Sequence, residues 1–305
     1  MDPATLSTLR STLGDRLQEN APLSGYTSAR IGGPADALLL VRSADDLAQV
    51  AQLLWEKEVP FLLLGGGSNV LVSDRGVRGA VIINRARKVT VDAQSEPPCI
   101  TAESGATLND LARRAVRSGL SGMEWAATVP GSLGGAVYGN AGAFDGDIAA
   151  SLVSTELIHR QAGRQTWPAE RLEYNYRTSL LKRQHLPVVI LSAKLVLEHG
   201  DKAAIQARMD LFSDQRRLTQ PPGASLGSMF KNPPGDFAGR LIEAAGLKGQ
   251  RVGNAEISPV HANFFINHGQ TRAADIQALI ELAQRTVFEK YGVKLELEIE
   301  LIGEY

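Results

Sequence analysis

Consecutive glycines directly after a short apolar run are the feature that most constrains this chain. The segment reads Leu62-Leu63-Leu64-Gly65-Gly66-Gly67-Ser68-Asn69. A buried strand ending in such a loop can turn backbone N–H groups toward an anion, and glycine lets a diphosphate approach where a Cβ would block it. The loop is not the dinucleotide fingerprint, because Val70 occupies the third glycine position, and it lacks the Gly-Lys-Ser/Thr of a P-loop. Alone, it predicts either a flexible turn or a phosphate-binding turn.

A second glycine cluster favours the phosphate-binding interpretation. It reads Val129-Pro130-Gly131-Ser132-Leu133-Gly134-Gly135-Ala136 and is followed by Asn140-Ala141-Gly142-Ala143. The segments 129–136 and 140–143 lie in a stretch from 119 to 146 with little hydrophobic periodicity, and loops of that length are uncommon unless they are functional. Two such loops suit a long diphosphate cofactor better than a mononucleotide, with tight backbone contact as the structural alternative.

Composition narrows the class of protein. The chain has 305 residues, 44% apolar and 21% charged, with a net charge of −1 and no basic stripe that would follow a nucleic-acid backbone. Its apolar runs are far shorter than the roughly 20 residues that cross a bilayer, and Met1-Asp2-Pro3 does not begin a signal peptide. A single cysteine, Cys99, and five dispersed histidines form no metal-ligand pattern. We expect a cytoplasmic protein that binds no metal, nucleic acid or membrane.

Hydrophobic periodicity and capping residues predict an α+β fold. Leu6, Leu9, Leu13 and Leu17 recur at helical spacing and predict an N-terminal helix within residues 1–20. Further helices are predicted at 43–58, 107–118, 201–217, 237–245 and 271–291, and strands at 37–41, 61–64, 81–83, 100–102, 152–159, 188–197, 261–267 and 295–302. Pro221-Pro222-Gly223 is a turn signal that ends the helix predicted at 201–217, and we place a domain boundary before that helix, near residue 200.

The segment Ser225-Leu226-Gly227-Ser228-Met229-Phe230-Lys231-Asn232-Pro233 concentrates polar and cationic groups. It satisfies two serine hydrolase signatures, G-x-S-x-G at 223–227 and S-x-x-K at 228–231. Neither has its required context, because prolines replace the preceding strand and no Ser-Asp-Asn or Lys-Thr-Gly companion follows. Ser228 near a cation could donate a proton or attack a carbonyl, and the local sequence leaves both possibilities open.

The C-terminal segment alternates leucine or isoleucine with Glu296, Glu298 and Glu300. This pattern predicts a strand with one apolar face and one solvated face. By itself it does not distinguish Glu298 from its neighbours. Arg177, in Tyr174-Asn175-Tyr176-Arg177-Thr178-Ser179, is equally ordinary on local grounds.

Several motifs in one order nevertheless carry a family resemblance. Besides the two glycine loops, they are Arg30-Ile31-Gly32-Gly33-Pro34-Ala35, Tyr176-Arg177-x-Ser179, Gly227-Ser228-x-Phe230-Lys231-Asn232-Pro233, His261-Ala262-Asn263-Phe264 and the final Leu-Glu-x-Glu strand. Over residues 22 to 304 the chain resembles the UDP-N-acetylenolpyruvoylglucosamine reductases, flavoproteins of peptidoglycan synthesis, in their shorter form. Met229, Leu297 and Glu300 depart from the usual pattern without removing an expected catalytic group.

The resemblance implies a fold and a reaction. It implies an FAD-binding domain of the p-cresol methylhydroxylase and vanillyl-alcohol oxidase type over residues 21–200, with subdomains of about 21–85 and 86–200, and a substrate-binding domain over 201–305. NADPH would reduce the FAD, and the hydride would pass from flavin N5 to C3 of the enolpyruvyl group of a UDP-sugar, giving UDP-N-acetylmuramate. A monomer is favoured.

The resemblance also assigns roles to residues. The catalytic residues would be Arg177, which stabilises the enolate, Ser228, which protonates C2, and Glu298, which can donate a hydrogen bond. The cofactor-binding residues would be Gly65, Gly66, Gly67, Ser68, Asn69, Pro130, Gly131, Ser132, Gly134, Gly135, Ala136 and Asn140. The substrate-binding residues would be Tyr176, Arg217, Lys231, Asn232 and His261.

Two other functions share part of this pattern. A flavin oxidase of the same fold, acting on a hydroxy acid or alcohol, would use both glycine loops but would leave the segments around Ser228 and Glu298 unexplained. A non-catalytic nucleotide-binding module would explain the glycines alone.

Overall fold

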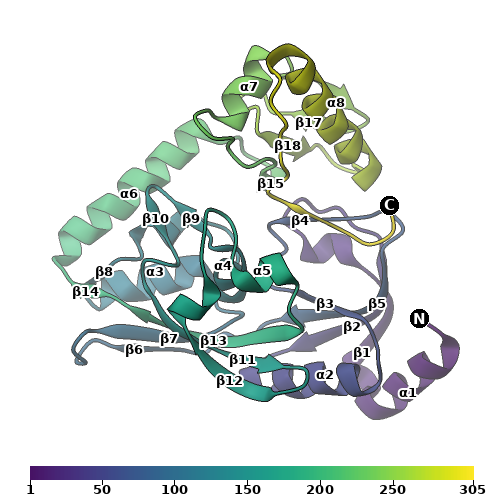
Figure 1. Ribbon diagram of the computed structural model, residues 1–305, viewed down its shortest axis with the longest axis vertical. Coiled ribbons are helices and arrows are strands. Elements are labelled where there is room, and N and C mark those ends of the chain that lie inside the picture. The colour runs from purple at the N-terminus through teal and green to yellow at the C-terminus, as the bar shows by residue number, and fades with distance from the viewer. The chain divides into compact units, whose positions relative to one another are not determined.

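The computed structural model describes residues 1–305, which form two compact units built from non-contiguous segments (Figure 1). Unit 1 comprises Met1–Leu38, Gly67–Val81 and Arg217–Tyr305, and unit 2 comprises Leu39–Gly66 and Ile82–Arg216. The division falls inside β2 (Pro34–Val41), β5 (Val77–Asn84) and α6 (Lys202–Thr219). The contiguous boundaries near residues 20, 85 and 200 stay predictions.

Unit 2 is organised around a five-stranded antiparallel sheet of order β12-β11-β13-β7-β6. The sheet strands are β6 (Val89–Asp92), β7 (Cys99–Glu103), β11 (Leu152–His159), β12 (Gly163–Pro168) and β13 (Val188–Val196). Its other elements are α2 (Ala44–Glu56), β3 (Phe61–Leu64), α3 (Leu108–Arg117), β8 (Leu120–Ser121), η3 (Glu124–Thr128), α4 (Leu133–Gly139), β9 (Gly142–Ala143), β10 (Gly146–Asp147), η4 (Ala169–Leu172), α5 (Leu180–Gln184) and β14 (Glu198–His199).

Helix α3 illustrates how the sequence builds this unit. The Thr107 hydroxyl accepts a hydrogen bond from Asp110 N at 3.3 Å, as expected of an N-cap, and Leu108, Leu111 and Ala115 are buried. Its apolar side chains join those of β7, β11 and β13 in one core. The helix predicted at 107–118 is therefore confirmed, as are the strands predicted at 61–64 and 152–159.

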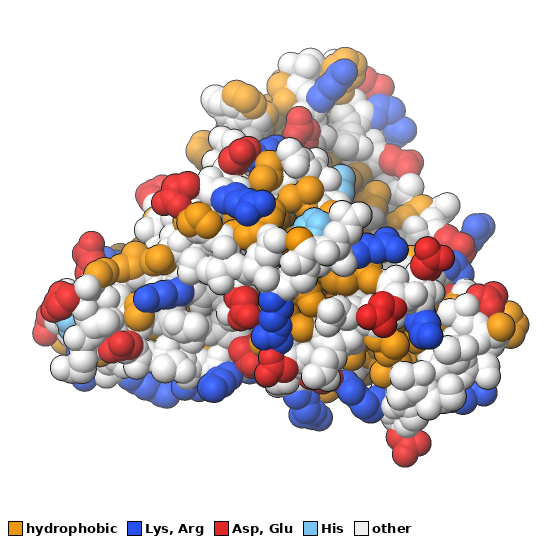
Figure 2. All heavy atoms as spheres, turned by 60° about the horizontal axis from the view of Figure 1, so that its bottom comes forward, with side chains coloured by type: hydrophobic (Ala, Val, Ile, Leu, Met, Phe, Trp, Pro, Cys, Tyr) orange, Lys and Arg blue, Asp and Glu red, His pale blue; other side chains and the backbone are white.

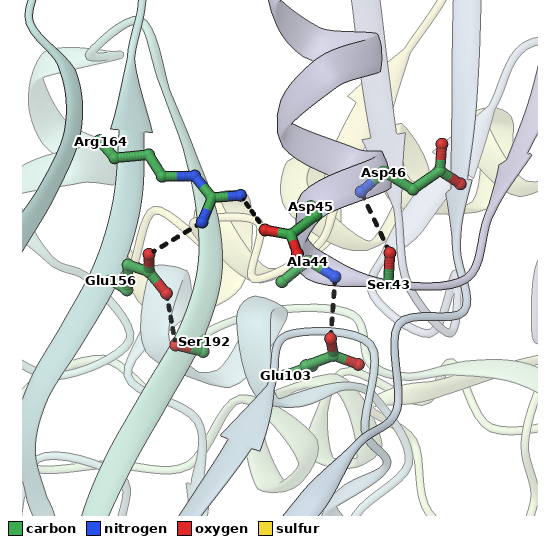
Figure 3. Close-up of polar contacts among 8 residues, drawn as sticks. All are labelled: Ser43, Ala44, Asp45, Asp46, Glu103, Glu156, Arg164 and Ser192. Atoms are coloured by element: carbon green, nitrogen blue, oxygen red, sulfur yellow. Dashed lines mark hydrogen bonds and ion pairs between the residues drawn. The ribbon is translucent and has the colours of Figure 1, made fainter.

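Polar contacts fix the first turn of α2 to the sheet (Figure 3). Glu103, at the end of β7, accepts a hydrogen bond from Ala44 N at 2.9 Å, satisfying a backbone donor that a helix N-terminus leaves without a partner. Arg164 on β12 pairs with Asp45 on α2 and lies 3.4 Å from Glu156 on β11. The helix that leads into the first glycine loop is thus anchored at its start.

Unit 1 contains a four-stranded antiparallel sheet of order β15-β18-β17-β16. Its strands are β15 (Ala224–Ser228), β16 (Arg251–Val252), β17 (Ala255–Ile257) and β18 (Phe264–Asn267), and α7 (Ala238–Ala244) and α8 (Ala273–Tyr291) share its core. Phe230 and Phe265 lie edge to face at the centre of that core. The remaining elements are α1 (Pro3–Leu13), η1 (Gly14–Arg16), β1 (Leu17–Pro22), η2 (Leu23–Tyr26), β4 (Val70–Val72) and β19 (Glu300–Ile302).

Four element predictions need correction. The N-terminal helix ends at Leu13, because Gly14 adopts a φ of 55°, and Leu17 begins β1. The glycine-rich stretch contains helix α4, which its small residues conceal from a periodicity test. The N-cap of α8 is Arg272 rather than Thr271, and the carboxylate of Asp74 accepts hydrogen bonds from Ala273 N and Ala274 N in the first turn, at 2.8 and 3.1 Å. The predicted strand at 295–302 is shortened to β19, which pairs in parallel with β4.

Lys and Arg side chains are interspersed with Asp and Glu on the face drawn in Figure 2, unlike the basic stripe of a surface that follows nucleic acid. None of the helices combines the length and apolar character required to span a bilayer.

Candidate functional site

The two glycine loops line one cavity of about 250 Å³ in unit 2. Five predicted cofactor-binding residues line it: Gly65, Gly66, Pro130, Gly131 and Ser132. Arg85, Arg87, Gly105, Thr107, Asn109 and Val129 complete the lining.

The closeness of the loops requires glycine at one of these positions and leaves little room for a side chain at the next. A Cβ on Gly65 would lie 2.1 Å from Ser132 Oγ, and one on Gly66 would lie 3.3 Å from the Cα of Gly131. A side chain at Gly65 would therefore displace the second loop. The loops contact each other through backbone and hydroxyl atoms, as expected of a cradle for a group that must approach the main chain closely.

Arg85 and Arg87 make this cavity cationic. Arg85 Nη1 donates a hydrogen bond to Gly65 O at 2.8 Å, which ties the segment directly after β5 to the glycine loop after β3. Arg87 is exposed. Two guanidinium groups beside glycine loops fit the diphosphate of FAD, because arginine forms strong charge-assisted hydrogen bonds to phosphate oxygens. Sequence reasoning missed both arginines, although their position directly after an apolar strand was an available signal.

The other predicted cofactor residues lie in or after these loops. Gly134, Gly135 and Ala136 belong to α4, whose N-cap is Ser132, and Asn140 is its C-cap. Gly134 N donates to Ser104 O at 2.8 Å and Leu133 N donates to Ala106 O at 2.8 Å. These bonds hold the start of α4 beside β7.

Arg177 occupies the tip of a tight turn in unit 2. Asn175 and Thr178 exchange backbone hydrogen bonds of 3.1 and 3.2 Å, so Tyr176 and Arg177 are the two central residues. Arg177 has a φ of 56°, a conformation that costs a non-glycine residue of order 1–3 kcal/mol and is concentrated at functional sites. Tyr176 is 55% exposed, and the Arg177 guanidinium carbon lies 5.4 Å from the centre of its ring.

In unit 1, backbone pairing brings Ser228 close to Glu298. Glu298 N donates to Met229 O at 2.9 Å, and Lys231 N donates to Glu296 O at 2.8 Å. Ser228 precedes this pairing by one residue, and both Ser228 and Glu298 are half-buried. The structure thus places the backbone of two residues that are separated by 70 positions in the chain on neighbouring segments, and their catalytic roles stay predictions.

The end of the first glycine loop contacts the same backbone. This loop crosses from unit 2 to unit 1 between Gly66 and Gly67. Asn69 Nδ2 donates to Glu298 O at 3.0 Å, and Asn69 O accepts from Glu300 N at 2.9 Å. Gly67 O accepts from Ser28 N at 3.0 Å. Gly67 and Asn69 are therefore engaged with the protein's own backbone in unit 1, and Asn69 fixes Glu298.

Asn263 fixes the segment after Ser228 from the other side. Its Oδ1 accepts from Phe230 N at 2.9 Å, its Nδ2 donates to Phe230 O at 2.8 Å, and its own carbonyl accepts from Met229 N at 2.8 Å. His261 Nδ1 accepts from Asn263 N at 3.2 Å. Burial lowers the pKa of His261, and nearby Lys248 lowers it further, so the neutral ring is favoured.

The predicted substrate-binding side chains differ in their engagement. Lys231 Nζ lies 3.5 Å from the exposed carboxylate of Glu296, and Asn232 Oδ1 accepts from Ala238 N at 3.1 Å at the start of α7. Arg217 is exposed near the end of α6. His261 is held by the contact with Asn263 described above. In unit 1, therefore, Lys231, Asn232 and His261 lie on connected segments.

Comparison with known proteins identifies the family. Residues 218–302 match the UDP-N-acetylenolpyruvoylglucosamine reductase, C-terminal domain, and residues 35–167 match the FAD binding domain. The UDP-N-acetylenolpyruvoylglucosamine reductase of Chloroflexus aggregans is 42% identical over 297 residues, covering 96% of this chain and 100% of that protein. This chain belongs to the UDP-N-acetylenolpyruvoylglucosamine reductase family. The Chloroflexus aurantiacus member is 40% identical over 289 residues, covering 94% and 97%.

A solved reductase structure supports the fold assignment. The crystal structure of UDP-N-acetylenolpyruvylglucosamine reductase from Thermus caldophilus is 37% identical, has a TM-score of 0.78, and covers 94% of this chain and 98% of that one. The predicted α+β fold with an FAD-binding unit and a C-terminal domain is confirmed, and this member of the reductase family is an FAD-dependent oxidoreductase. Membership excludes a module that only binds nucleotides and favours a reductase over a hydroxy acid oxidase.

Proposed function

We propose that the protein reduces UDP-N-acetylglucosamine enolpyruvate to UDP-N-acetylmuramate with NADPH, through FAD, in peptidoglycan precursor synthesis. The observation that carries this proposal beyond family membership is the backbone pairing that brings Ser228 and Glu298 together, with Asn69 bonded to the Glu298 backbone. A flavin oxidase has no need of this arrangement. A cytoplasmic monomer is part of the same proposal.

The cavity of unit 2 would hold the diphosphate of FAD. Gly65, Gly66 and Gly131 leave room for it beside the main chain, and Arg85 and Arg87 would balance its charge. Bound FAD would supply the hydride chemistry that no side chain provides. The protein's own contribution is to bind, to orient and to manage charge and protons.

Addition of hydride at C3 of the enolpyruvyl group leaves an electron pair at C2, and its negative charge is delocalised into the substrate carboxylate as the enolate of that carboxylate. The Arg177 guanidinium would stabilise this charge, and a protonated Glu298 would donate a hydrogen bond to it; one preorganised donor of this kind contributes about 3–4 kcal/mol. The Ser228 hydroxyl would then deliver its proton to C2. A serine hydroxyl is a weak acid, so the role requires a strongly basic acceptor, which the enolate provides.

The UDP part of the substrate needs cationic and amide groups. We propose Tyr176, Arg217, Lys231, Asn232 and His261 for this role. Lys231 is supported by its place three residues after Ser228, where backbone pairing with Glu296 holds it. Arg and Lys suit a diphosphate, and an amide suits carbonyl and hydroxyl groups.

A spectroscopic titration tests the proposal. The purified protein should show the absorbance of bound flavin, lose it when NADPH is added without oxygen, and regain it when UDP-N-acetylglucosamine enolpyruvate is added. NADH in a parallel sample measures the nicotinamide preference. Flavin that is reduced by hydroxy acids or alcohols and consumes oxygen, with no reoxidation by the enolpyruvyl nucleotide, would overturn the proposal in favour of an oxidase.

A further inference from the structure

Three side-chain hydrogen bonds connect the last turn of α4 to the turn that carries Arg177. Tyr174 Oη donates to Val137 O at 2.9 Å, and Ser179 Oγ donates to Tyr138 O at 2.6 Å. Asn140 Nδ2 donates to Asn175 O at 3.2 Å. The carbonyls at a helix C-terminus lack intrahelical partners, so they are natural acceptors for these hydroxyl groups.

These contacts are buried and specific. Ser179 is 0% exposed and Asn140 is 5% exposed. Asn140 adopts a φ of 48°, and its Oδ1 accepts from Ala149 N at 3.2 Å while its Nδ2 also lies 3.3 Å from Asp147 Oδ2. Burial raises the pKa of the Tyr174 phenol, so the hydroxyl stays protonated and donates. The Asn140 amide is thus committed to the protein itself.

The turn that these contacts hold is a strained one. Arg177 stands at its second central position with a positive φ, where glycine or asparagine is usual. A conformation of this kind persists only where the surroundings determine it, and here Tyr174 and Ser179 fix the chain on both sides. The contacts made by Tyr174 and Ser179 therefore fix the backbone from which the Arg177 side chain extends.

The opposite end of α4 lies at the cofactor cavity. Pro130, Gly131 and Ser132 line that cavity, and Ser132 is the N-cap of α4. Helix α4 has seven residues, about two turns, so its two ends are about 10 Å apart. One short rigid element therefore connects the cavity to the Arg177 turn within unit 2.

We propose that Tyr174, Ser179 and Asn140 are positioning residues, which hold Arg177 in a fixed place relative to the bound cofactor by tying its turn to α4. The inference rests on the proposed function, in which Arg177 stabilises the enolate. It assigns Asn140 to orientation of this turn, an alternative to direct contact with the cofactor.

Minimal substitutions test these roles. Tyr174→Phe removes one hydroxyl, and Asn140→Gly removes the amide while keeping a residue that tolerates positive φ. Thr155→Val is the matched control, because Thr155 is also buried in unit 2 and its hydroxyl donates to Ser192 O at 2.8 Å, on the sheet, and not to α4 or to the turn that carries Arg177. All variants are prepared as the flavin-bound full chain.

The two half-reactions separate the outcomes. We expect reoxidation of reduced flavin by the enolpyruvyl nucleotide to slow by about ten- to hundredfold in Tyr174→Phe and Asn140→Gly, as small displacements of a reacting group can do. Flavin affinity and reduction by NADPH should stay within about twofold of wild type, a range well below the tenfold that corresponds to about 1.4 kcal/mol. Thr155→Val should leave both half-reactions unchanged.

A double-mutant cycle identifies the residue through which they act. In an Arg177→Ala background, Tyr174→Phe and Asn140→Gly should cause no further loss of reoxidation rate, because the group they position is gone. Equal losses in both backgrounds, or single variants that keep the wild-type rate, would overturn the positioning role alone. A reduced wild-type enzyme that the nucleotide does not reoxidise would overturn the proposed function together with this inference.

Discussion

Replacement of Asn263 by alanine is the most informative change in unit 1. The Asn263 amide forms two hydrogen bonds to the backbone of Phe230, at 2.9 Å to its N–H and 2.8 Å to its carbonyl. Phe230 is 1% exposed, so water does not readily replace the lost partner. The Asn263→Ala variant leaves a buried donor and a buried acceptor without their side-chain partner, two residues after Ser228.

The expected cost follows from these two bonds. A buried hydrogen-bonding group left without a partner costs about 1–3 kcal/mol, so the two groups left by Asn263→Ala should lower the free energy of unfolding by about 2–6 kcal/mol. We also expect reoxidation of reduced flavin by the enolpyruvyl nucleotide to slow by roughly tenfold or more, because the Ser228 hydroxyl loses its fixed direction. Reduction of the flavin by NADPH should be unchanged.

The control is Asn267→Ala, at the end of β18, the strand that follows Asn263. Asn267 Nδ2 donates to Ala29 O at 2.7 Å, and its Oδ1 accepts from Gly269 N at 2.7 Å, without contact to residues 228–231. It should lose comparable stability and keep the reoxidation rate. Unfolding is followed by circular dichroism in urea, because the three tryptophans, at 55, 125 and 167, all lie in unit 2. If both variants slow reoxidation equally, Asn263 supports the fold and not the direction of Ser228.

Three further outcomes are expected. Ser228→Ala should bind flavin and accept hydride from NADPH but lose most reoxidation by the nucleotide, and a wild-type rate would exclude Ser228 as the proton donor. Arg87→Gln should weaken flavin binding by roughly tenfold, the loss of one charge-assisted bond, whereas the exposed Arg113→Gln should not. The pKa of His261 is lowered in the folded protein, so its stabilising contribution is present above about pH 6.5 and is lost as the pH falls below that value. His261→Gln should therefore make the melting temperature less dependent on pH below about pH 6.5, and the same dependence as in the wild type would contradict this.

The sequence predicted the elements that depend on local signals. Thr107 and Ser43 accept hydrogen bonds from backbone N–H groups three residues later, at 3.3 and 3.1 Å, so the start of each helix was readable from its capping residue. Apolar runs likewise gave the bounds of β3 and β11. Alternation and capping are properties of a few consecutive residues, so the elements that depend on them can be predicted without knowledge of tertiary contacts.

Contacts between distant segments were not readable in this way. No local pattern indicates that Arg85 bonds the carbonyl of Gly65, that Asp74 accepts hydrogen bonds from the first turn of α8, or that Asn263 clamps Phe230. Helix α4 was missed because its seven residues include three glycines, which lower helix propensity, and its stability comes from tertiary bonds such as that of Ser179 to Tyr138 O. The family resemblance supplied what periodicity could not, namely which ordinary residues to examine.

Glu298 shows why the departure from a local rule is informative. Strict alternation over 295–302 would bury every leucine and expose every glutamate, yet Leu301 is 40% exposed and Glu298 is half-buried. The reason is a change of partner: residues 296–298 pair with 229–231, and Glu300 to Ile302 pair with β4. Glu298 lies where the first pairing ends, and Asn69 Nδ2 satisfies its carbonyl there. Glu300, in β19, is half-buried as well, so the partial burial of these glutamates follows from the segments that they pair with and not from alternation along the chain.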